Sequence, residues 1–221
     1  MINLPKCQEL FAFNSFFFAK LFDGIEYPWE IIPLLKERIE AILSQTPKGY
    51  ERINERVVVG KGARIASSVK IEGTAIIGAN ADIRHCAFLR GSVIIGDGCV
   101  VGNSCEIKNS VMMDGAQAPH FNYVGDSVLG EKAHIGAGVI CSNLRSDGKS
   151  VRIRTDEVAY DTGLRKLGAI LGDRAEIGCG AVLCPGAVIG AGASVYPLTC
   201  ARGVYPGDSI VKDCTTVIAK A

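Results

Sequence analysis

Aromatic residues are scarce in this chain of 221 residues: they make up 7% of it and include a single tryptophan. Hydrophobic residues nevertheless reach 48%, so the core must consist mainly of aliphatic side chains and alanine. Net charge is also nearly absent, at +1 from 24 basic and 23 acidic residues. Without a strong field of either sign, the composition does not indicate binding to nucleic acid or to a membrane surface. Any basic site must therefore be local.

No hydrophobic run is long enough to cross a membrane. The most apolar segment, Leu10 to Phe22, is about 13 residues long and contains three polar residues, whereas a spanning helix needs about 20 apolar residues. No small-x-small cleavage site follows the segment, which argues against a secretory signal. We expect it to form an amphipathic helix packed on a partner surface.

The chain has nine cysteines but no CxxC pair, the spacing of many metal and redox sites. Cys99 and Cys105 occupy positions that hold small residues in a six-residue repeat. Small buried hydrophobic residues are therefore a better interpretation than a disulfide framework. We expect a reducing, cytoplasmic setting.

What the chain does contain is a repeat of six residues. Every sixth position from Val59 is apolar: Val59, Ile65, Ile71, Ile77, Ile83, Leu89, Ile95, Val101, Ile107 and Met113. A small or β-branched residue lies two positions before each of these, and glycine often follows. This period fits neither an α-helix nor alternating strands, and a fixed short repeat indicates a solenoid.

The hexads predict an all-β fold, a left-handed parallel β-helix, over residues 57–221. Each hexad would form one short face and one corner, with its apolar residue stacked along the axis on the coils above and below. Residues 1–56 are predicted to form a helical appendage. Within it, Trp29 to Leu43 places four residues on one helical stripe. These are Ile31, Leu35, Ile39 and Ile42.

Two interruptions break the repeat. After Met113 the next sixth position is Pro119, and the series resumes only at Leu129. Residues 144–167 have no hexad phase and carry six basic residues beside four acids. Function is expected where a local rule fails, and insertions in solenoids form loops that often bind ligands. The first interruption contains His120, one of only three histidines.

Polar residues in and around the first interruption resemble those of a known family. The matching strings are Leu89-Arg90-Gly91, Val101-Gly102-Asn103, Glu106-Ile107-Lys108, His120 through Asp126, and Ile135-Gly136-Ala137-Gly138 with Asn143. They are similar to the acetyltransferase domain of the bifunctional bacterial enzyme that acetylates glucosamine 1-phosphate and then uridylylates the product. No glycine-rich nucleotide-binding stretch precedes the repeat, so we expect the uridylyltransferase half to be absent.

The resemblance implies three catalytic roles. His120 matches the general base, and Glu106 matches the carboxylate that supports it. Ala137 lies where a backbone amide meets the thioester oxygen. These groups suit the chemistry, because acetylation of an amine requires a base that works near neutral pH and a donor for the developing oxyanion. An ion pair with Lys108 is an equally good interpretation of Glu106.

The resemblance also implies a substrate site. The residues that would hold the sugar and its phosphate are Arg90, Lys108, Tyr123, Asn143 and Lys149. Arg90 and Lys108 are separated by three hexads, so the repeat itself places them on one face of adjacent coils. Cationic and hydroxyl donors arranged in this way would form charge-assisted bonds with a phosphate.

The predicted function is transfer of acetyl from acetyl-CoA to the amine of a hexosamine 1-phosphate or related amino sugar. The resemblance implies a homotrimer, with sites between subunits and the pantetheine arm beside Leu171 to Val195. The competing hypothesis is a catalytically silent subunit that assembles with, or regulates, a separate sugar-phosphate nucleotidyltransferase. Acetyl-CoA binding would separate the two hypotheses.

No metal is required by this chemistry. His85 and His134 raise a zinc alternative, but the histidines lack the short-spaced pair found in β-helix carbonic anhydrases. His134 also stands where the family usually has an asparagine, and residues 144–167 are longer than the family's loop. Both departures affect which sugar would be accepted.

Overall fold

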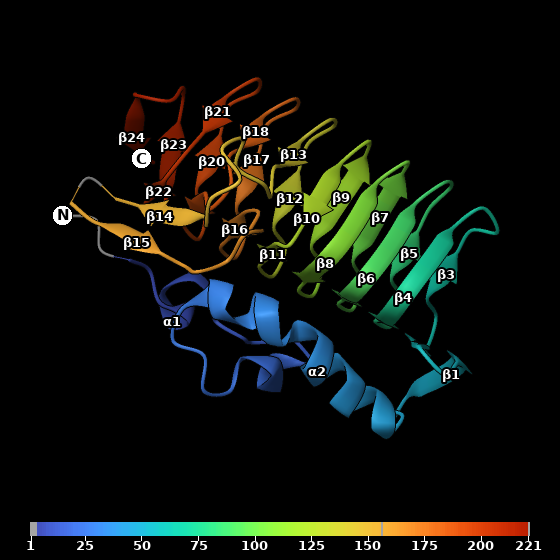
Figure 1. Ribbon diagram of the computed structural model, residues 1–221. Helices are drawn as coiled ribbons and strands as arrows, with labels where there is room; N and C mark the ends of the chain where they lie inside the picture. The colour runs from blue at the N-terminus through green and yellow to red at the C-terminus, as the bar shows by residue number, and fades with distance from the viewer. Residues whose placement is uncertain (1–3, 156, 221) are drawn as a thin grey trace.

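The computed structural model describes residues 4–155 and 157–220. Its main body is a left-handed parallel β-helix, as the hexads predict (Figure 1). Three long strands each bend across two faces, β4 (Lys70–Ile77), β6 (Phe88–Ile95) and β8 (Glu106–Met112). Among the described residues, no helix is long and apolar enough to span a bilayer.

Short strands extend the three faces above and below the long ones. The first face continues through β10 (Tyr123–Gly125), β13 (Ile140–Cys141), β18 (Val182–Leu183) and β21 (Cys200–Ala201). The second face contains β2 (Val57–Gly60), β11 (Val128–Leu129), β16 (Ile170–Leu171), β19 (Val188–Ile189) and β22 (Val204–Tyr205). The third face contains β3 (Arg64–Ile65), β5 (Asp82–Ile83), β7 (Val100–Asn103), β9 (Gln117–His120), β12 (His134–Ile135), β17 (Glu176–Ile177), β20 (Ser194–Val195) and β23 (Ser209–Val211).

Antiparallel strands cover one sheet edge at each end of the solenoid. β1 (Tyr50–Asn54) pairs with β2, and β24 (Val217–Ala219) pairs with β23. These additions cover sheet edges that would otherwise be free to pair with another chain.

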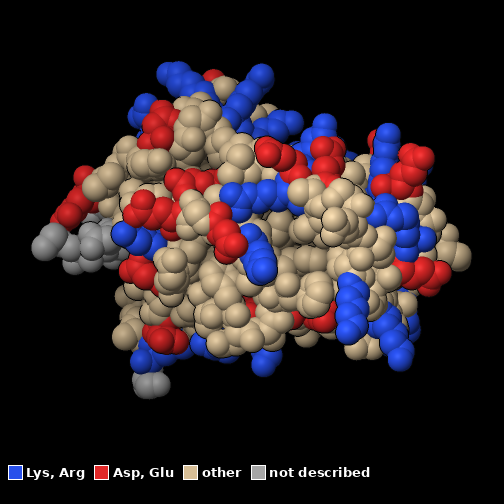
Figure 2. Space-filling view, turned by 90° about the horizontal axis from the view of Figure 1, so that it is seen from below, with Lys and Arg blue, Asp and Glu red and all other residues tan. Residues whose placement is uncertain are grey.

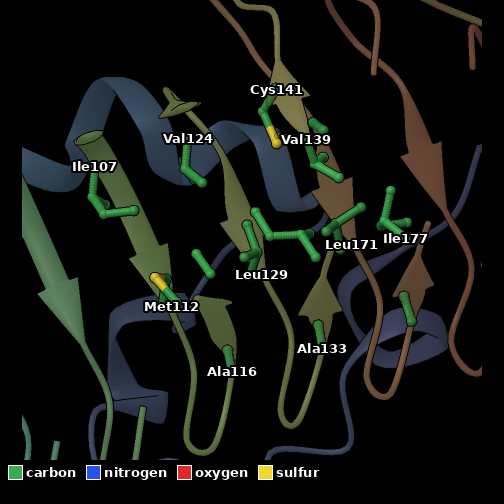
Figure 3. Close-up of a cluster of buried hydrophobic side chains, with 14 of the residues drawn as sticks. Ile107, Met112, Ala116, Val124, Leu129, Ala133, Val139, Cys141, Leu171 and Ile177 are labelled. Atoms are coloured by element: carbon green, nitrogen blue, oxygen red, sulfur yellow. The ribbon is translucent and has the colours of Figure 1, made fainter. Parts of the chain in front are cut away.

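Aliphatic and small side chains fill the axis of the β-helix, as predicted. Ile107, Val124, Leu129 and Leu171 are fully buried, and their side chains point into the interior of the β-helix (Figure 3). Each coil stacks its inward residues on those of the next, so burial accumulates with the number of coils. At the open first coil, by contrast, Ile65 is 38% exposed.

The predicted series is wrong at its last member. The inward residue after Ile107 is Met112, whereas Met113 points outward on the second face. Met113 belongs to a second hydrophobic cluster, called the outer core, in which the N-terminal segment packs on the outward side chains of the second face. The cause is a shorter corner in β8. Arg90 pairs with Lys108, three full hexads further along the chain. The next pair in the same two strands, Val93 and Ser110, is separated by one residue less than three hexads. Asn109 turns this corner with a φ of 50°, a left-handed conformation that asparagine tolerates.

The segment from Pro119 to Asp126 is therefore no interruption. Ala118 and Val124 continue the inward series on β9 and β10, and both are fully buried. A second short corner follows, where Asp126 has a φ of 49°. The repeat persists with coils one residue shorter than three hexads, as the pairing of Ile107 with Val124 illustrates.

The N-terminal segment covers the second face of the β-helix (Figure 1). It contains α1 (Cys7–Leu10), the 3₁₀ turns η1 (Ala19–Phe22) and η2 (Pro28–Glu30), and α2 (Ile31–Ser44). In α2 the predicted residues Ile31, Leu35 and Ile39 are buried, together with Ile32 and Leu43, whereas the predicted Ile42 is only partly buried.

The predicted helix from Leu10 to Phe22 is wrong. Only its last four residues form a 3₁₀ turn, and the segment packs on this chain's own β-helix. Its backbone donors are used elsewhere: Ala12 N donates to Asp173 Oδ2 at 2.8 Å, and Ser15 N donates to Glu131 Oε1 at 3.0 Å. These buried acceptors replace the intrahelical bonds.

The described part of residues 144–167 contains two paired antiparallel strands, β14 (Arg152–Arg154) and β15 (Ala159–Asp161), which we call the hairpin. Val151 and Ile153 are fully buried and join the outer core. Tyr160 packs against Trp29, with ring centroids 5.7 Å apart. The hairpin therefore contacts both the β-helix and the N-terminal segment.

All nine cysteines are free. Four are buried, as predicted: Cys7, Cys99, Cys105 and Cys141. Burial raises the pKa of Cys141 to about 12. The prediction is wrong for four exposed ones, Cys86, Cys179, Cys200 and Cys214, because the hexad repeat says nothing about outward positions.

In the view of Figure 2, acidic and basic residues are interspersed over the surface, consistent with the small net charge.

Candidate active site

Several of the predicted site residues meet on the first face of the β-helix. Arg90 lies beside Lys108 in the register of β6 and β8, so the predicted stacking is confirmed. Tyr123 lies beside Glu106 in the register of β8 and β10. Arg90 Nε donates to Glu106 Oε1 at 2.7 Å. Glu106 thus pairs with Arg90 rather than with Lys108 or His120.

Asp126 connects these residues to the next coil. Its carboxylate accepts from Lys108 Nζ at 2.8 Å, from Asn109 Nδ2 at 3.2 Å and from Asn143 Nδ2. The residue is 3% exposed, and buried polar atoms need hydrogen-bond partners from the protein in place of water. Arg90, Glu106, Lys108, Tyr123, Asp126 and Asn143 are called the polar network below.

Sequence reasoning did not assign a role to Asp126. A signal was present, because Asp126 follows Lys108 by three hexads, the same spacing that links Lys108 to Arg90. The left-handed corner carries the Asp126 carboxylate across to Lys108 of the preceding coil.

Tyr123 and Asn143 converge over Gly125. A Cβ atom at Gly125 would lie 2.5 Å from Tyr123 Oη and 2.8 Å from Asn143 Nδ2, so only glycine leaves room for both groups. Burial raises the pKa of Tyr123, and the charges of Glu106 and Asp126 add to the effect. The phenol therefore stays protonated and available as a donor at neutral pH.

His120 and Ala137 lie at the corner between the third and first faces. His120 ends β9 and is exposed, and its carbonyl accepts from Gly138 N at 3.0 Å on the adjacent coil. The contacts among described residues give the His120 ring no hydrogen-bond partner and the Ala137 N–H no acceptor. Both groups are therefore free to contact a ligand.

Lys149 lies outside the polar network. It is exposed in the inserted segment, where its backbone N–H donates to Asp147 Oδ1 at 3.2 Å. The structure therefore joins four of the five predicted substrate residues and leaves Lys149 apart.

The other two histidines have separate neighbours. His85 Nδ1 lies 2.7 Å from Ser68 Oγ, and His134 Nδ1 lies 2.9 Å from Glu176 Oε2. Across residues 4–155 and 157–220, no three His, Cys, Asp or Glu side chains are grouped in a way that could hold a metal ion. His134 pairs in register with Gln117 on the third face, away from the polar network.

Comparison with known proteins identifies relatives of this chain. The sequence model of the family described as "GMPPB C-terminal domain" matches residues 71–162. A bifunctional sugar-1-phosphate nucleotidylyltransferase/acetyltransferase of Sulfurisphaera tokodaii is 37% identical over 174 residues, covering 77% of this chain and 43% of the relative. A bifunctional protein GlmU of Methanocaldococcus jannaschii is 33% identical over 166 residues, covering 74% of this chain and 40% of the relative.

The chain thus spans less than half the length of these two bifunctional relatives. A third relative is nearer to it in size. The uncharacterized acetyltransferase YaiX of Escherichia coli is 32% identical over 195 residues, which cover 79% of this chain and 82% of the relative. Together with the hexads and the β-helix, these matches show that the chain belongs to the hexapeptide-repeat acetyltransferases related to GlmU.

Proposed function

We propose that this chain is an acetyl-CoA-dependent N-acetyltransferase whose acceptor is the amine of glucosamine 1-phosphate or a related hexosamine 1-phosphate. The observation that carries the proposal is the polar network on the first face, built from successive coils and adjoining the corner with His120 and Ala137. Membership of the acetyltransferase family supplies the reaction class.

The polar network retains donors for a phosphate. Arg90 uses Nε for Glu106, which leaves its two Nη groups as a fork suited to phosphate oxygens. Lys108 uses one of its three ammonium protons on Asp126. The protonated phenol of Tyr123 would add a neutral donor beside them.

In the proposed reaction the neutral amine attacks the thioester carbonyl carbon, the carbon–sulfur bond breaks and coenzyme A leaves as the thiol. His120 accepts the proton from the amine nitrogen and returns it to the leaving sulfur. The free N–H of Ala137 would stabilise the oxyanion of the tetrahedral intermediate. The balance of atoms and protons requires no metal.

A homotrimer with sites between subunits is part of the proposal. In the single chain, the Glu106 carboxylate binds Arg90 instead of His120. A hydrogen-bond partner for the His120 ring would therefore come from a neighbouring subunit. The pantetheine arm would lie beside residues 171–195 of one subunit. A cytoplasmic location would supply acetyl-CoA.

A second candidate is a catalytically silent subunit of a sugar-phosphate nucleotidyltransferase assembly. The observation that favours it is the pairing of both cations, Arg90 with Glu106 and Lys108 with Asp126. Such pairs stabilise a structure without requiring a ligand. This subunit would have no need of acetyl-CoA.

The test separates the two functions. Purified protein is titrated with acetyl-CoA by calorimetry and then assayed for thiol release with glucosamine 1-phosphate, galactosamine 1-phosphate and the unphosphorylated sugars. The proposal predicts binding and turnover with at least one amino-sugar 1-phosphate, and much weaker turnover without the phosphate. Absence of both binding and thiol release would leave the silent subunit.

A further inference from the structure

The inserted hairpin and the last coils enclose a cavity of about 460 Å³. One wall carries Arg145, Arg152 and Arg154 of the insertion, and the other carries Arg202 beside Cys184. Leu144, which also lines the cavity, directly follows Asn143 of the polar network. The cavity therefore begins where the candidate active site ends.

The charges around this cavity are unbalanced. Asp147 binds Arg145 through two bonds, of 2.9 and 2.5 Å, and Asp161 Oδ2 lies 3.5 Å from Arg152 Nε. Within the described part of the chain, no ion pair involves Arg154 or Arg202. Two guanidinium groups are thus left to attract an anion.

The same two arginines also line an adjoining cavity of about 530 Å³, together with Tyr205 and Thr215. Arg154 and Arg202 therefore line both of two adjoining spaces. An extended ligand could place its anionic group at the arginines and its remaining parts on either side.

Arg152 and Arg154 are carried on β14, a strand that packs firmly on the β-helix. Val151 and Ile153, which flank Arg152, are fully buried in the outer core. Gly203 has a φ of 98°, and a Cβ there would lie 3.0 Å from the Arg154 carbonyl oxygen, so glycine permits β14 to approach the last coils. A rigid support preserves the spacing of the arginines before a ligand binds.

We infer that this cavity binds the diphosphate group of a nucleotide. Guanidinium forks match phosphate oxygens in pairs, and the two arginines that form no ion pair with a described residue, Arg154 and Arg202, would each engage one phosphate of a diphosphate. The two spaces together are of a size that accommodates a small organic ligand. Both a nucleoside diphosphate sugar and coenzyme A carry such a group, and the test distinguishes them. The inference does not rest on the proposed acetyl transfer.

The test compares two double variants of this chain under reducing conditions. One is Arg154→Gln with Arg202→Gln. The control is Arg64→Gln with Arg84→Gln, which removes two exposed arginines that flank Asp82 on the third face. Calorimetric titrations use pyrophosphate, UDP and coenzyme A at low and at raised salt, and thermal unfolding verifies that each variant is folded.

We expect pyrophosphate to bind the wild-type protein and the control equally, and the Arg154/Arg202 variant at least tenfold more weakly. Binding should weaken as salt rises. If UDP shows the larger increase in affinity over pyrophosphate, the ligand is a nucleoside diphosphate sugar. If coenzyme A shows the larger increase, the ligand is the acyl donor. No pyrophosphate binding to the wild type, or equal binding to all three proteins, would overturn the inference. Because the readout is binding, inactivity in the acetyl-transfer assay would leave it standing.

Discussion

At the scale of single residues, two carboxylates organise the candidate site. The sequence alone predicted no role for Asp126 and no bond between Glu106 and Arg90. Asp126 accepts from three side chains of two neighbouring coils. Glu106 holds the guanidinium of Arg90. Each acid fixes a cation in place, so the donors that we propose for a phosphate would be positioned before a substrate arrives.

The Lys108–Asp126 pair provides a test of this organisation. Its side chains are only 14% and 4% exposed, so removing one partner leaves a buried charge with too few partners. We expect Lys108→Ala to destabilise the protein by about 3 kcal/mol. Asp126→Ala should cost a similar amount, and the double variant should cost clearly less than the sum. Strict additivity in urea unfolding would show that the pair is not coupled.

Asp114 gives a prediction with a defined pH range. Burial raises its pKa to about 6 from a usual value of 3.8, with Asp97 and Glu131 adding to the shift. Because the folded state binds this proton more tightly, the contribution of Asp114 to stability is most favourable below pH about 4. It is lost as the pH rises through about 6.

Asp114→Asn should therefore stabilise the protein at pH 7.5, because the amide carbonyl can still accept from Asp97 N. The side chain is partly exposed, so we expect a gain of about 1 kcal/mol rather than the full value of the shift. Urea unfolding at pH 7.5 and pH 4 measures it. A gain that is equal at both pH values would contradict the assigned cause.

At the scale of elements, the N-terminal segment is fastened to the β-helix by buried acceptors. Glu131 accepts from Ser15 N at 3.0 Å, Ser15 Oγ at 2.9 Å and Phe16 N at 3.2 Å. The same segment inserts several phenylalanines into the outer core. Its conformation is therefore set by contacts with the second face and not by helix propensity.

Glu131→Ala should release this segment locally. We expect faster amide hydrogen exchange at Ser15 and Phe16, because their donors lose a partner, while α2 keeps its protection. Exchange measured by mass spectrometry on peptides covering 10–22 and 31–44 tests this. Glu40→Ala, an exposed change on α2, serves as the control. Unchanged exchange in 10–22 would mean that the phenylalanines alone hold the segment.

At the scale of the whole molecule, the sequence was sufficient for the β-helix and for the stacking of Arg90 on Lys108. Both follow from a fixed period, which acts identically in every coil. The one-residue slip was hidden because Met112 and Met113 are both apolar and either fits the axis. Asp126 was missed although its spacing to Lys108 is visible in the sequence, because the contact between them also depends on the corner at Asp126. The segment from Leu10 to Phe22 was misjudged because its conformation depends on contacts with distant parts of the chain, which no local pattern encodes.

In our proposal, the corner beside the polar network is an acetyl-transfer site with His120 as its base. The direct measurement is the rate of thiol release from acetyl-CoA with saturating amino-sugar 1-phosphate, in wild type, His120→Ala and His85→Ala. His85 is a matched control, because it is exposed and its carbonyl accepts from Asn103, the residue beside His120 in register. We predict a loss of about 100-fold or more in His120→Ala and little change in His85→Ala. Equal rates in all three proteins would contradict the account.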